Sequence, residues 1–317
     1  MISKLILKYF NNPILERLDD SALIEINEGR LAFSTDSYTV DPIFFPGGDI
    51  GELAINGTVN DLAMLGAKPL YLSVGFILEE GFPIADLESI LNSMKKAAVE
   101  ADVSIVTGDT KVVPKKAADK IFINTSGIGI IPNGVNICGK NASPGDKIIV
   151  SGTIADHGVT ILTQREGLKF ESSLKSDTAP LNHLVAEMIS QSDQIHVLRD
   201  PTRGGVATSL NEIAQQSSVG IMLYEDKIPV RDDVSGACEL LGLDPLYIAN
   251  EGKLLAFVSA EQAHIVIDAM QKNKYGKQAC EIGEVIKDHP GKVFLKTNIG
   301  GTRIVDMLTG EQLPRIC

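Results

Sequence analysis

The sequence is short of cysteine and of positive charge, and it has no long apolar run. Its four cysteines are far apart, with no CxxC pair and no histidine at zinc-finger spacing, which argues against a metal cage or a disulfide framework. A balance of 29 basic against 41 acidic residues gives a net charge of -12, so the surface repels phosphate backbones and anionic lipid heads. We therefore expect no nucleic-acid partner and no membrane surface.

No segment approaches the roughly 20 consecutive apolar residues that cross a bilayer. Residues 1–10 are apolar but are interrupted by Lys4 and Lys8, and no small-residue cleavage site follows them. Together with the scattered cysteines, this favours a reducing, cytoplasmic location.

Two common nucleotide-binding motifs are also missing. Neither GxxxxGKS nor GxxxxGKT occurs, and no GxGxxG follows a predicted strand. A nucleotide site in this chain must therefore be built in another way.

What the chain does have is a repeated alternation of strand and helix patterns, with 44% hydrophobic residues over a length that usually exceeds one core. We predict an α/β (α+β) chain of two domains, at residues 1–133 (core about 30–132) and 146–297, with turn residues between them. Residues 298–317 show no sustained periodicity and are predicted to be a flexible tail. The predicted helices lie at 52–65, 83–101, 180–190, 206–216 and 261–272, and the predicted strands at 31–35, 105–109, 120–131, 147–152, 220–223 and 253–258.

Four aspartates stand among small or apolar neighbours in the first half: Asp36, Asp49, Asp61 and Asp109. Asp36 and Asp109 each follow an apolar run and a small residue, so both are predicted to lie at strand ends. Isolated carboxylates are costly to bury unless a cation binds them, and Mg²⁺ prefers such oxygen ligands. Each aspartate taken alone could equally cap a turn or a helix.

A short polar segment around Asp109 suits a phosphate group. Gly108 lets backbone N–H groups approach an anion closely, and Lys111 adds a mobile positive charge two residues beyond Asp109. With Thr110 between them, these four residues are candidate triphosphate contacts.

The second half carries two further candidate sites. Asp200 and Arg203 precede a predicted helix together with two glycines, which fits a phosphate contact or an ordinary turn with a paired acid and base. Glu251 opens a predicted strand and could be a base or a turn residue. His157 lies between small residues in a predicted loop, where a hydrogen-bonded structural role is the more common outcome.

Cys317 is the last residue of the chain, on the predicted tail. A reactive exposed thiol is usually a liability, so its position indicates a use, although a terminal cysteine can be accidental. At roughly 3.3 Å per residue, the segment from Gly301 could extend on the order of 50 Å, enough to reach the first domain of its own chain or of a neighbour.

Six segments together resemble the HypE family of hydrogenase maturation proteins, within the superfamily of aminoimidazole ribonucleotide synthetase, thiamine-monophosphate kinase and selenophosphate synthetase. They are residues 34–42, 60–69, 107–113, 199–205, 250–253 and the ending 314–317. The resemblance implies a two-domain PurM-like architecture that dimerises through its N-terminal sheets in a barrel-like interface. It also implies an N-terminal ATP-binding domain, with ATP in a groove beside that interface.

The resemblance also implies roles for individual residues. Mg²⁺ would be held by Asp36, Asp61 and Asp109, and the ATP contacts would be Asp36, Asp49, Asp61, Gly108, Asp109, Thr110, Asp200 and Arg203. Lys111 would stabilise charge or transfer a proton, Glu251 would be the base and Cys317 the carrier. In the family, the carbamoyltransferase HypF loads the terminal thiol, ATP-dependent dehydration gives a thiocyanate, and the cyanide passes to iron held by HypC and HypD for the nickel–iron hydrogenase.

Two other functions compete with this one. The chain could be another ATP-dependent kinase or synthetase of the superfamily that acts on a free small molecule, and normal activity without Cys317 would favour it. It could also be a non-enzymatic scaffold that binds nucleotide and presents its tail to partners, although the acids and Lys111 make that less economical.

Overall fold

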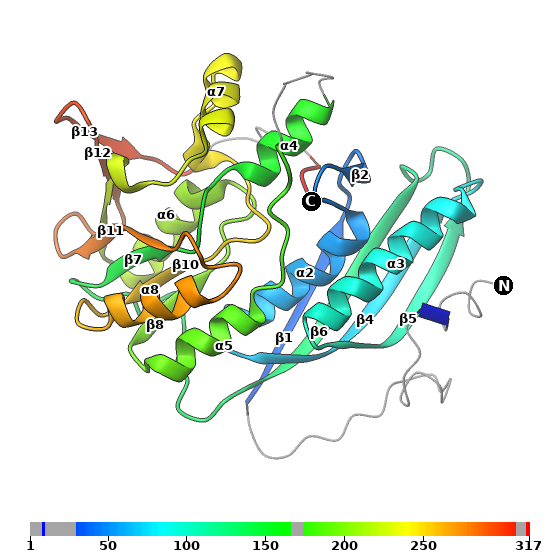
Figure 1. The fold of residues 1–317 in the computed structure, drawn as a ribbon, viewed down its shortest axis with the longest axis horizontal. Helices are drawn as coiled ribbons and strands as arrows, with labels where there is room; N and C mark the ends of the chain where they lie inside the picture. The colour runs from blue at the N-terminus through cyan, green and yellow to red at the C-terminus, as the bar shows by residue number, and fades with distance from the viewer. Residues whose placement is uncertain (1–7, 10–29, 166–173, 309–314) are drawn as a thin grey trace.

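The structure is a computed structural model that describes residues 8–9, 30–165, 174–308 and 315–317. It contains two main β-sheets, each packed against helices, with the chain end lying between α4 (Asp156–Arg165) and the short strand β2 (Phe44–Phe45) (Figure 1). Among the described residues, no helix is long and apolar enough to cross a membrane.

The first sheet has four strands in the order β1-β6-β4-β5. The β1/β6 and β6/β4 pairs are antiparallel, and the β4/β5 pair is parallel. The strands are β1 (Arg30–Tyr38), β6 (Ile121–Ile131), β4 (Lys68–Glu79) and β5 (Ser104–Val113). Strands β1 and β5 are therefore the two edges of this sheet.

Two helices, α2 (Ile50–Ala63) and α3 (Ile84–Glu100), cover one face of the first sheet (Figure 1). Alternate residues of β6 show why: Ile121 and Ile123 are buried on the helix side, whereas Phe122 and Asn124 point to the opposite face. That opposite face has no covering element among the described residues. It carries exposed apolar side chains, of which Phe33 is 69% exposed.

The second sheet has seven strands in the order β13-β12-β9-β11-β7-β10-β8. In chain order these are β7 (Lys147–Val150), β8 (Ile195–Arg199), β9 (Gly220–Tyr224), β10 (Leu255–Val258), β11 (Cys280–Ile286), β12 (Val293–Lys296) and β13 (Thr302–Val305). The helices of this half are α4, α5 (Asn182–Gln191), α6 (Gly205–Ser217), α7 (Asp232–Leu241) and α8 (Ala263–Lys272), with 3-10 turns η2 (Glu225–Lys227) and η3 (Pro245–Tyr247).

Both faces of the second sheet are covered, which is why its central strands read as continuous apolar runs. Ile148 and Val150 of β7 pack in the cluster that contains α6, whereas Ile149 packs in the cluster that contains α5 and α8. The mixed α/β fold predicted from the sequence is confirmed, and so are all five predicted helices and all six predicted strand regions, with shifted ends.

Two predictions about strand ends are wrong. Asp36 lies inside β1, which continues to Tyr38, and Asp109 lies inside β5, which continues to Val113. A small polar stretch does not end a strand when the next residues still pair with a neighbour, and here the β1/β6 ladder continues through Ser37.

The prediction that residues 298–317 lack regular structure is wrong for Thr302–Val305, which form β13 against β12. Four residues are too few for periodicity to show, and pairing with β12 provides the order. The chain end, Arg315–Cys317, is also placed against other segments. The rest of the predicted tail, 309–314, lies outside the described residues, as does most of 1–29 at the start of the predicted first domain.

Candidate active site

Six of the predicted site residues line one cavity of about 160 Å³ between the two halves: Asp36, Asp61, Asp200, Arg203, Glu251 and Cys317. Gly57 and Thr202 complete its lining. Asp36 comes from β1, Gly57 and Asp61 from α2, and the others from the second half and the chain end. Segments that are more than 200 residues apart in the chain thus meet at one point.

Helix α2 is joined to the second half beside Asp61. The buried Asn60 side chain donates to the carbonyls of Ala179 (3.0 Å) and Glu251 (3.1 Å), and accepts from Leu181 N at 2.8 Å. Because a buried amide left unpaired costs about 1–3 kcal/mol, these contacts fix Asp61 relative to the second half. Ser34 of β1 donates to Asp61 Oδ2 at 2.6 Å and orients the carboxylate from the other side.

The cavity is lined by four side-chain carboxyl groups and one guanidinium group, that of Arg203. Burial raises the pKa of Asp61, and burial together with the charge of Asp61 raises the pKa of Asp200 to about 7. Burial also raises the pKa of Glu251 well above its ordinary value, and the charges of Asp177 and Asp200 raise it further. The site is therefore electrostatically prepared for a cation.

Glu251 is 4% exposed, and its Oε1 has no hydrogen-bond partner among the described residues. Its own N–H donates to Asp177 Oδ1 at 3.1 Å. Before it, the Asn250 side chain donates to Pro201 O (2.8 Å) and accepts from Ala155 N (2.7 Å). After it, a Cβ at Gly252 would lie 1.8 Å from the Asp177 carbonyl, so only glycine fits there. The segment therefore holds a carboxylate with a free oxygen, and not merely a turn.

A buried ion pair lies beneath Glu251. Lys253 Nζ is 3.1 Å from Asp177 Oδ2, with the side chains 13% and 5% exposed. Burial alone would raise the pKa of Asp177, but the charge of Lys253 holds it below its ordinary value. The sequence analysis missed Asp177, because nothing in its local pattern distinguishes it from a surface residue.

The Cys317 thiol faces this acidic cavity. Arg203 Nη2 lies 3.8 Å from its Sγ, and burial, followed by the charge of Glu251, raises the pKa of the thiol to about 12. At neutral pH the thiol is therefore uncharged in this position. A group carried on Cys317 would lie beside Glu251 and Arg203.

The segment Gly108–Lys111 does not join this cavity. Asp36 lies opposite Thr125, whose hydroxyl donates to Ala54 O of α2, so Asp36 is on the helix-covered face. Asp109 lies opposite Gly75, on the uncovered face of β5. The two edges are three strand spacings apart, roughly 14 Å. Within one chain, Asp36 and Asp109 therefore cannot bind the same Mg²⁺ ion, contrary to the simplest form of the prediction.

Asp109 instead pairs with Lys111 across 2.8 Å, with both side chains about two-thirds exposed, at 68% and 70%. The hydrogen bond from Lys111 lowers the pKa of Asp109. This acid needs no added cation, unlike those in the cavity.

Asp49 also lies away from the cavity. Its Oδ1 accepts from Gly51 N (2.8 Å) and Glu52 N (3.0 Å) as the N-cap of α2, and Ser93 donates to its other oxygen at 2.5 Å. These contacts match the capping alternative, so its assignment to ATP stays a prediction without geometric support.

His157 is in the first turn of α4 and is fully buried, and not in a loop as predicted. Its ring nitrogens contact Ser176 Oγ and Ile316 O, both at 2.8 Å. The glycine that follows it, Gly158, packs within the helix, and its Cβ would meet Ile248 at 2.5 Å. A glycine therefore signalled close packing here, and not a turn.

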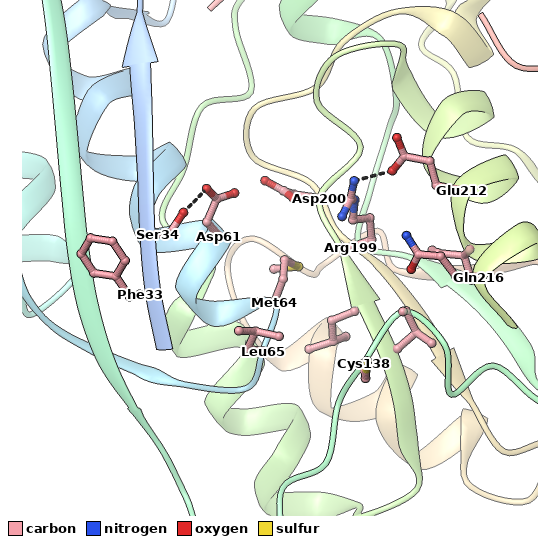
Figure 2. Close-up of a pocket in the computed structure, with 14 residues that line it drawn as sticks. Phe33, Ser34, Asp61, Met64, Leu65, Cys138, Arg199, Asp200, Glu212 and Gln216 are labelled. Atoms are coloured by element: carbon pink, nitrogen blue, oxygen red, sulfur yellow. Dashed lines mark hydrogen bonds and ion pairs between the residues drawn. The ribbon is translucent and has the colours of Figure 1, made fainter. Parts of the chain in front are cut away.

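A second cavity, of about 340 Å³, adjoins the acidic one and shares Asp61 and Asp200 with it. Figure 2 shows Asp61 and Asp200 facing each other across it, with Met64 and Leu65 of the first half opposite the second half and an Arg199–Glu212 ion pair at its side. Much of its lining is apolar, including Val197, Leu198 and Ile213.

The residues present fit Mg²⁺ that is bound together with a phosphate ligand. Within residues 8–9, 30–165, 174–308 and 315–317, no three His, Cys, Asp or Glu side chains are close enough to hold a metal ion by themselves. Mg²⁺ typically keeps waters and phosphate oxygens beside one or two carboxylates. The raised pKa values of Asp61 and Asp200 are what such a site would show without its cation.

The chain is similar to known proteins over most of its length. Two family models match: AIR synthase related protein, N-terminal domain, at residues 18–131, and the C-terminal domain of the same family at residues 143–296. The carbamoyl dehydratase HypE of Azotobacter vinelandii is 53% identical over 317 residues, which cover 100% of this chain and 93% of that protein.

Solved structures show the same similarity. The hydrogenase maturation protein HypE in complex with ATP has a TM-score of 0.96 and 53% identity, with 100% of this chain and 95% of that chain covered. A chain of a HypE-HypF complex has a TM-score of 0.86 and 49% identity, with 97% and 99% covered. Thiamine-monophosphate kinase from Stenotrophomonas maltophilia, at 19% identity and a TM-score of 0.68 over 88% and 89%, shares the fold alone.

Proposed function

The chain belongs to the HypE family of carbamoyl dehydratases, which act in hydrogenase maturation, and from that premise we propose that it uses ATP to dehydrate a carbamoyl group carried on its own Cys317. The product is a protein thiocyanate. The observation that carries this proposal is the position of the Cys317 thiol inside the acidic cavity, beside Glu251 and Arg203. A kinase that acts on a free small molecule would have no use for a chain end that fills its site.

The roles follow from the chemistry that each side chain can perform. Asp36, Asp61 and Asp200 would hold Mg²⁺ together with the phosphates of ATP, and ATP would supply the phosphoryl group that makes the carbamoyl oxygen a good leaving group. Glu251, with its free Oε1, accepts one proton from the carbamoyl nitrogen when the carbamoyl oxygen is phosphorylated. Transfer of the γ-phosphoryl group to the carbamoyl oxygen releases ADP and gives S–C(OPO₃²⁻)=NH. The phosphate then leaves with the carbamoyl oxygen and the second N–H proton as HPO₄²⁻, which gives S–C≡N, so one water is removed overall. Arg203 offsets the negative charge that collects on the leaving oxygen.

Glu251 is suited to act as a base because its buried surroundings disfavour the ionised carboxylate and so favour its protonation. Burial raises the pKa of Glu251, which makes its ionised form a stronger base. Cation binding at the neighbouring acids would favour that ionised form.

The cavity of Figure 2 suits the nucleoside of ATP. It opens beside Asp61 and Asp200, where the phosphates would lie, and its apolar walls offer a surface for a purine. Phe33 and Ser34 place it at the β1 edge, next to the uncovered face of the first sheet.

The uncovered face of the first sheet fits a second copy of this chain. It carries apolar side chains that water would otherwise contact, with Leu31 47% and Ile77 42% exposed beside Phe33. A two-fold pairing of these faces would bring the β5 edge of one copy, with Asp109 and Lys111, toward the β1 edge of the other. Lys111 of the partner copy would then add positive charge beside the acidic cavity, and Gly108, Thr110 and Lys111 would take their predicted roles across the interface.

The proposed partners follow from the same chemistry and from the relatives. Cys317 must first receive its carbamoyl group, and a HypF-like carbamoyltransferase fits because a similar chain is found in a HypE-HypF complex. A HypC-HypD complex that accepts cyanide at iron would take the product.

The test is mass spectrometry of the C-terminal peptide after the carbamoyl group has been loaded and Mg-ATP added, with C317A as the control. Loss of one water that depends on ATP supports self-directed dehydration. An unchanged adduct, despite confirmed loading and ATP binding, contradicts the proposal.

A further inference from the structure

The backbone of the chain end is held by a set of donors from both halves. Each carbonyl of Arg315–Cys317 accepts a hydrogen bond from a distant segment. The pairs are Arg165 Nη2 with Arg315 O (2.8 Å), His157 Nε2 with Ile316 O (2.8 Å) and Thr39 N with Cys317 O (2.9 Å). The segment is thus bound through its main chain, as an added strand would be.

His157 is the most enclosed of these donors. Its side chain is 0% exposed, and its ring packs edge-on against Phe45 with the centroids 5.6 Å apart. Ile316, whose carbonyl it contacts, is 3% exposed and packs with the core of the first half. Loss of this donor would leave a carbonyl without a partner where water enters poorly, which is costly.

The hydrogen-bond directions around His157 are determined by its neighbours. A carbonyl can only accept, so Nε2 carries the hydrogen that Ile316 O receives. Burial lowers the pKa of His157, so the ring is neutral and Nδ1 accepts from Ser176 Oγ at 2.8 Å. Ser176 Oγ in turn accepts from Thr178 N at 3.2 Å. The Ile316 carbonyl therefore selects the tautomer, and Ser176 holds the ring in the orientation that reaches the chain end.

From these contacts we propose that His157, oriented by Ser176, is a positioning residue that seats the chain end and so determines whether Cys317 lies in the cavity or in solution. We call the bound position of residues 315–317 the seat. The hydrogen bonds alone support this position, whereas its effect on dehydration rests on the proposed function. With the seat formed, the thiol lies beside Arg203 and Glu251. With the seat lost, the thiol is free to meet a partner that loads or unloads it.

The test compares two variants of the full chain, H157N and H157Q, each of which retains one side-chain N–H donor group in place of the ring. The Gln side-chain nitrogen can take the place of Nε2 and donate to Ile316 O, whereas the Asn nitrogen lies nearer the position of Nδ1 and cannot. The measurement is the rate of alkylation by iodoacetamide at each cysteine, read by peptide mass spectrometry. The seated thiol is protonated and reacts poorly, so the rate at Cys317 reports the unseated fraction.

We expect H157N to raise the alkylation rate of Cys317 about tenfold, equivalent to ~1.4 kcal/mol of lost seating, and H157Q to stay near the parent rate. Cys238, which is 1% exposed, should react equally slowly in all three proteins and serves as the internal control for folding. An H157N rate at Cys317 equal to that of the parent overturns the proposal.

A second variant keeps the test decisive if H157N also loosens the fold. S176A leaves the ring in place and removes the partner of Nδ1, so we expect an increase of about threefold at Cys317 alone. No increase overturns the role of Ser176. In the dehydration assay, H157N should lower kcat with an unchanged KM for ATP, with rescue by H157Q. Parent protein that loads but never dehydrates would contradict the proposed function and leave the alkylation result standing.

Discussion

At one edge of the first sheet, Asp36 lies beside Asp61 and Asp200 in a cavity with excess negative charge, whereas at the other edge Asp109 is exposed and paired with Lys111. Both aspartates follow an apolar run and a small residue in the sequence. The difference arises from what packs around each aspartate: residues of the second half and the chain end line the cavity with Asp36, whereas the Asp109 side chain is 68% exposed. The same local pattern thus places Asp36 in a cavity with excess negative charge and Asp109 in an exposed ion pair with Lys111.

The largest effect is expected at the covered edge, from Glu251→Gln. The amide keeps the shape of the side chain but cannot accept a proton, so dehydration should fall on the order of 10²–10⁴-fold while carbamoylated Cys317 still forms. Peptide mass spectrometry measures both steps. The melting temperature should not fall, because Gln removes a buried carboxyl whose ionised form is disfavoured. Dehydration at the parent rate would exclude Glu251 as the base.

The second prediction tests whether the uncovered edge acts through a partner copy. K111A and E251Q should each be nearly inactive, but an equal mixture that exchanges subunits should regain about a quarter of the parent activity. This follows because half of the dimers are then mixed and each mixed dimer has one intact site. If Lys111 acts within its own chain, no mixed dimer has an intact site. Activity no greater than the sum of the two variants would then contradict a shared site.

The smallest effect is on stability and compares D200N with D109N. The pKa of Asp200 is raised from an unfolded value of about 3.9 to about 7, so its contribution is fully present below about pH 4 and is lost as pH rises through 7. Without Mg²⁺, D200N should therefore be more stable than the parent at pH 8, on the order of 4 kcal/mol, and equal to it at pH 4. D109N, on the exposed edge, should show no measurable gain. Melting curves at both pH values measure the stability. An equal gain in stability for D200N and D109N would contradict the difference between the two aspartates.

Much of the fold could be predicted because its signals are local. Helix α3 has apolar residues at helical spacing, with Leu87, Ile90 and Leu91 all buried on one face. The edge strand β13 was missed because four residues, two of them charged or polar, carry no periodic signal and depend on pairing with β12. His157 was misassigned because a glycine beside it suggested a loop, although that glycine serves close packing in α4.

The sequence by itself determined the α/β class, the acidic surface, the identity of the candidate residues and the presence of a thiol at the chain end, since these depend on composition and on patterns within a few residues. Only the tertiary structure decided which acids share a cavity, that Asp109 and Lys111 lie on the far edge and opposite face, and that Cys317 is seated by His157. These features depend on contacts between segments up to 278 residues apart, such as Thr39 with Cys317. Burial and the nearest charges, which no local pattern encodes, then set the pKa of each group.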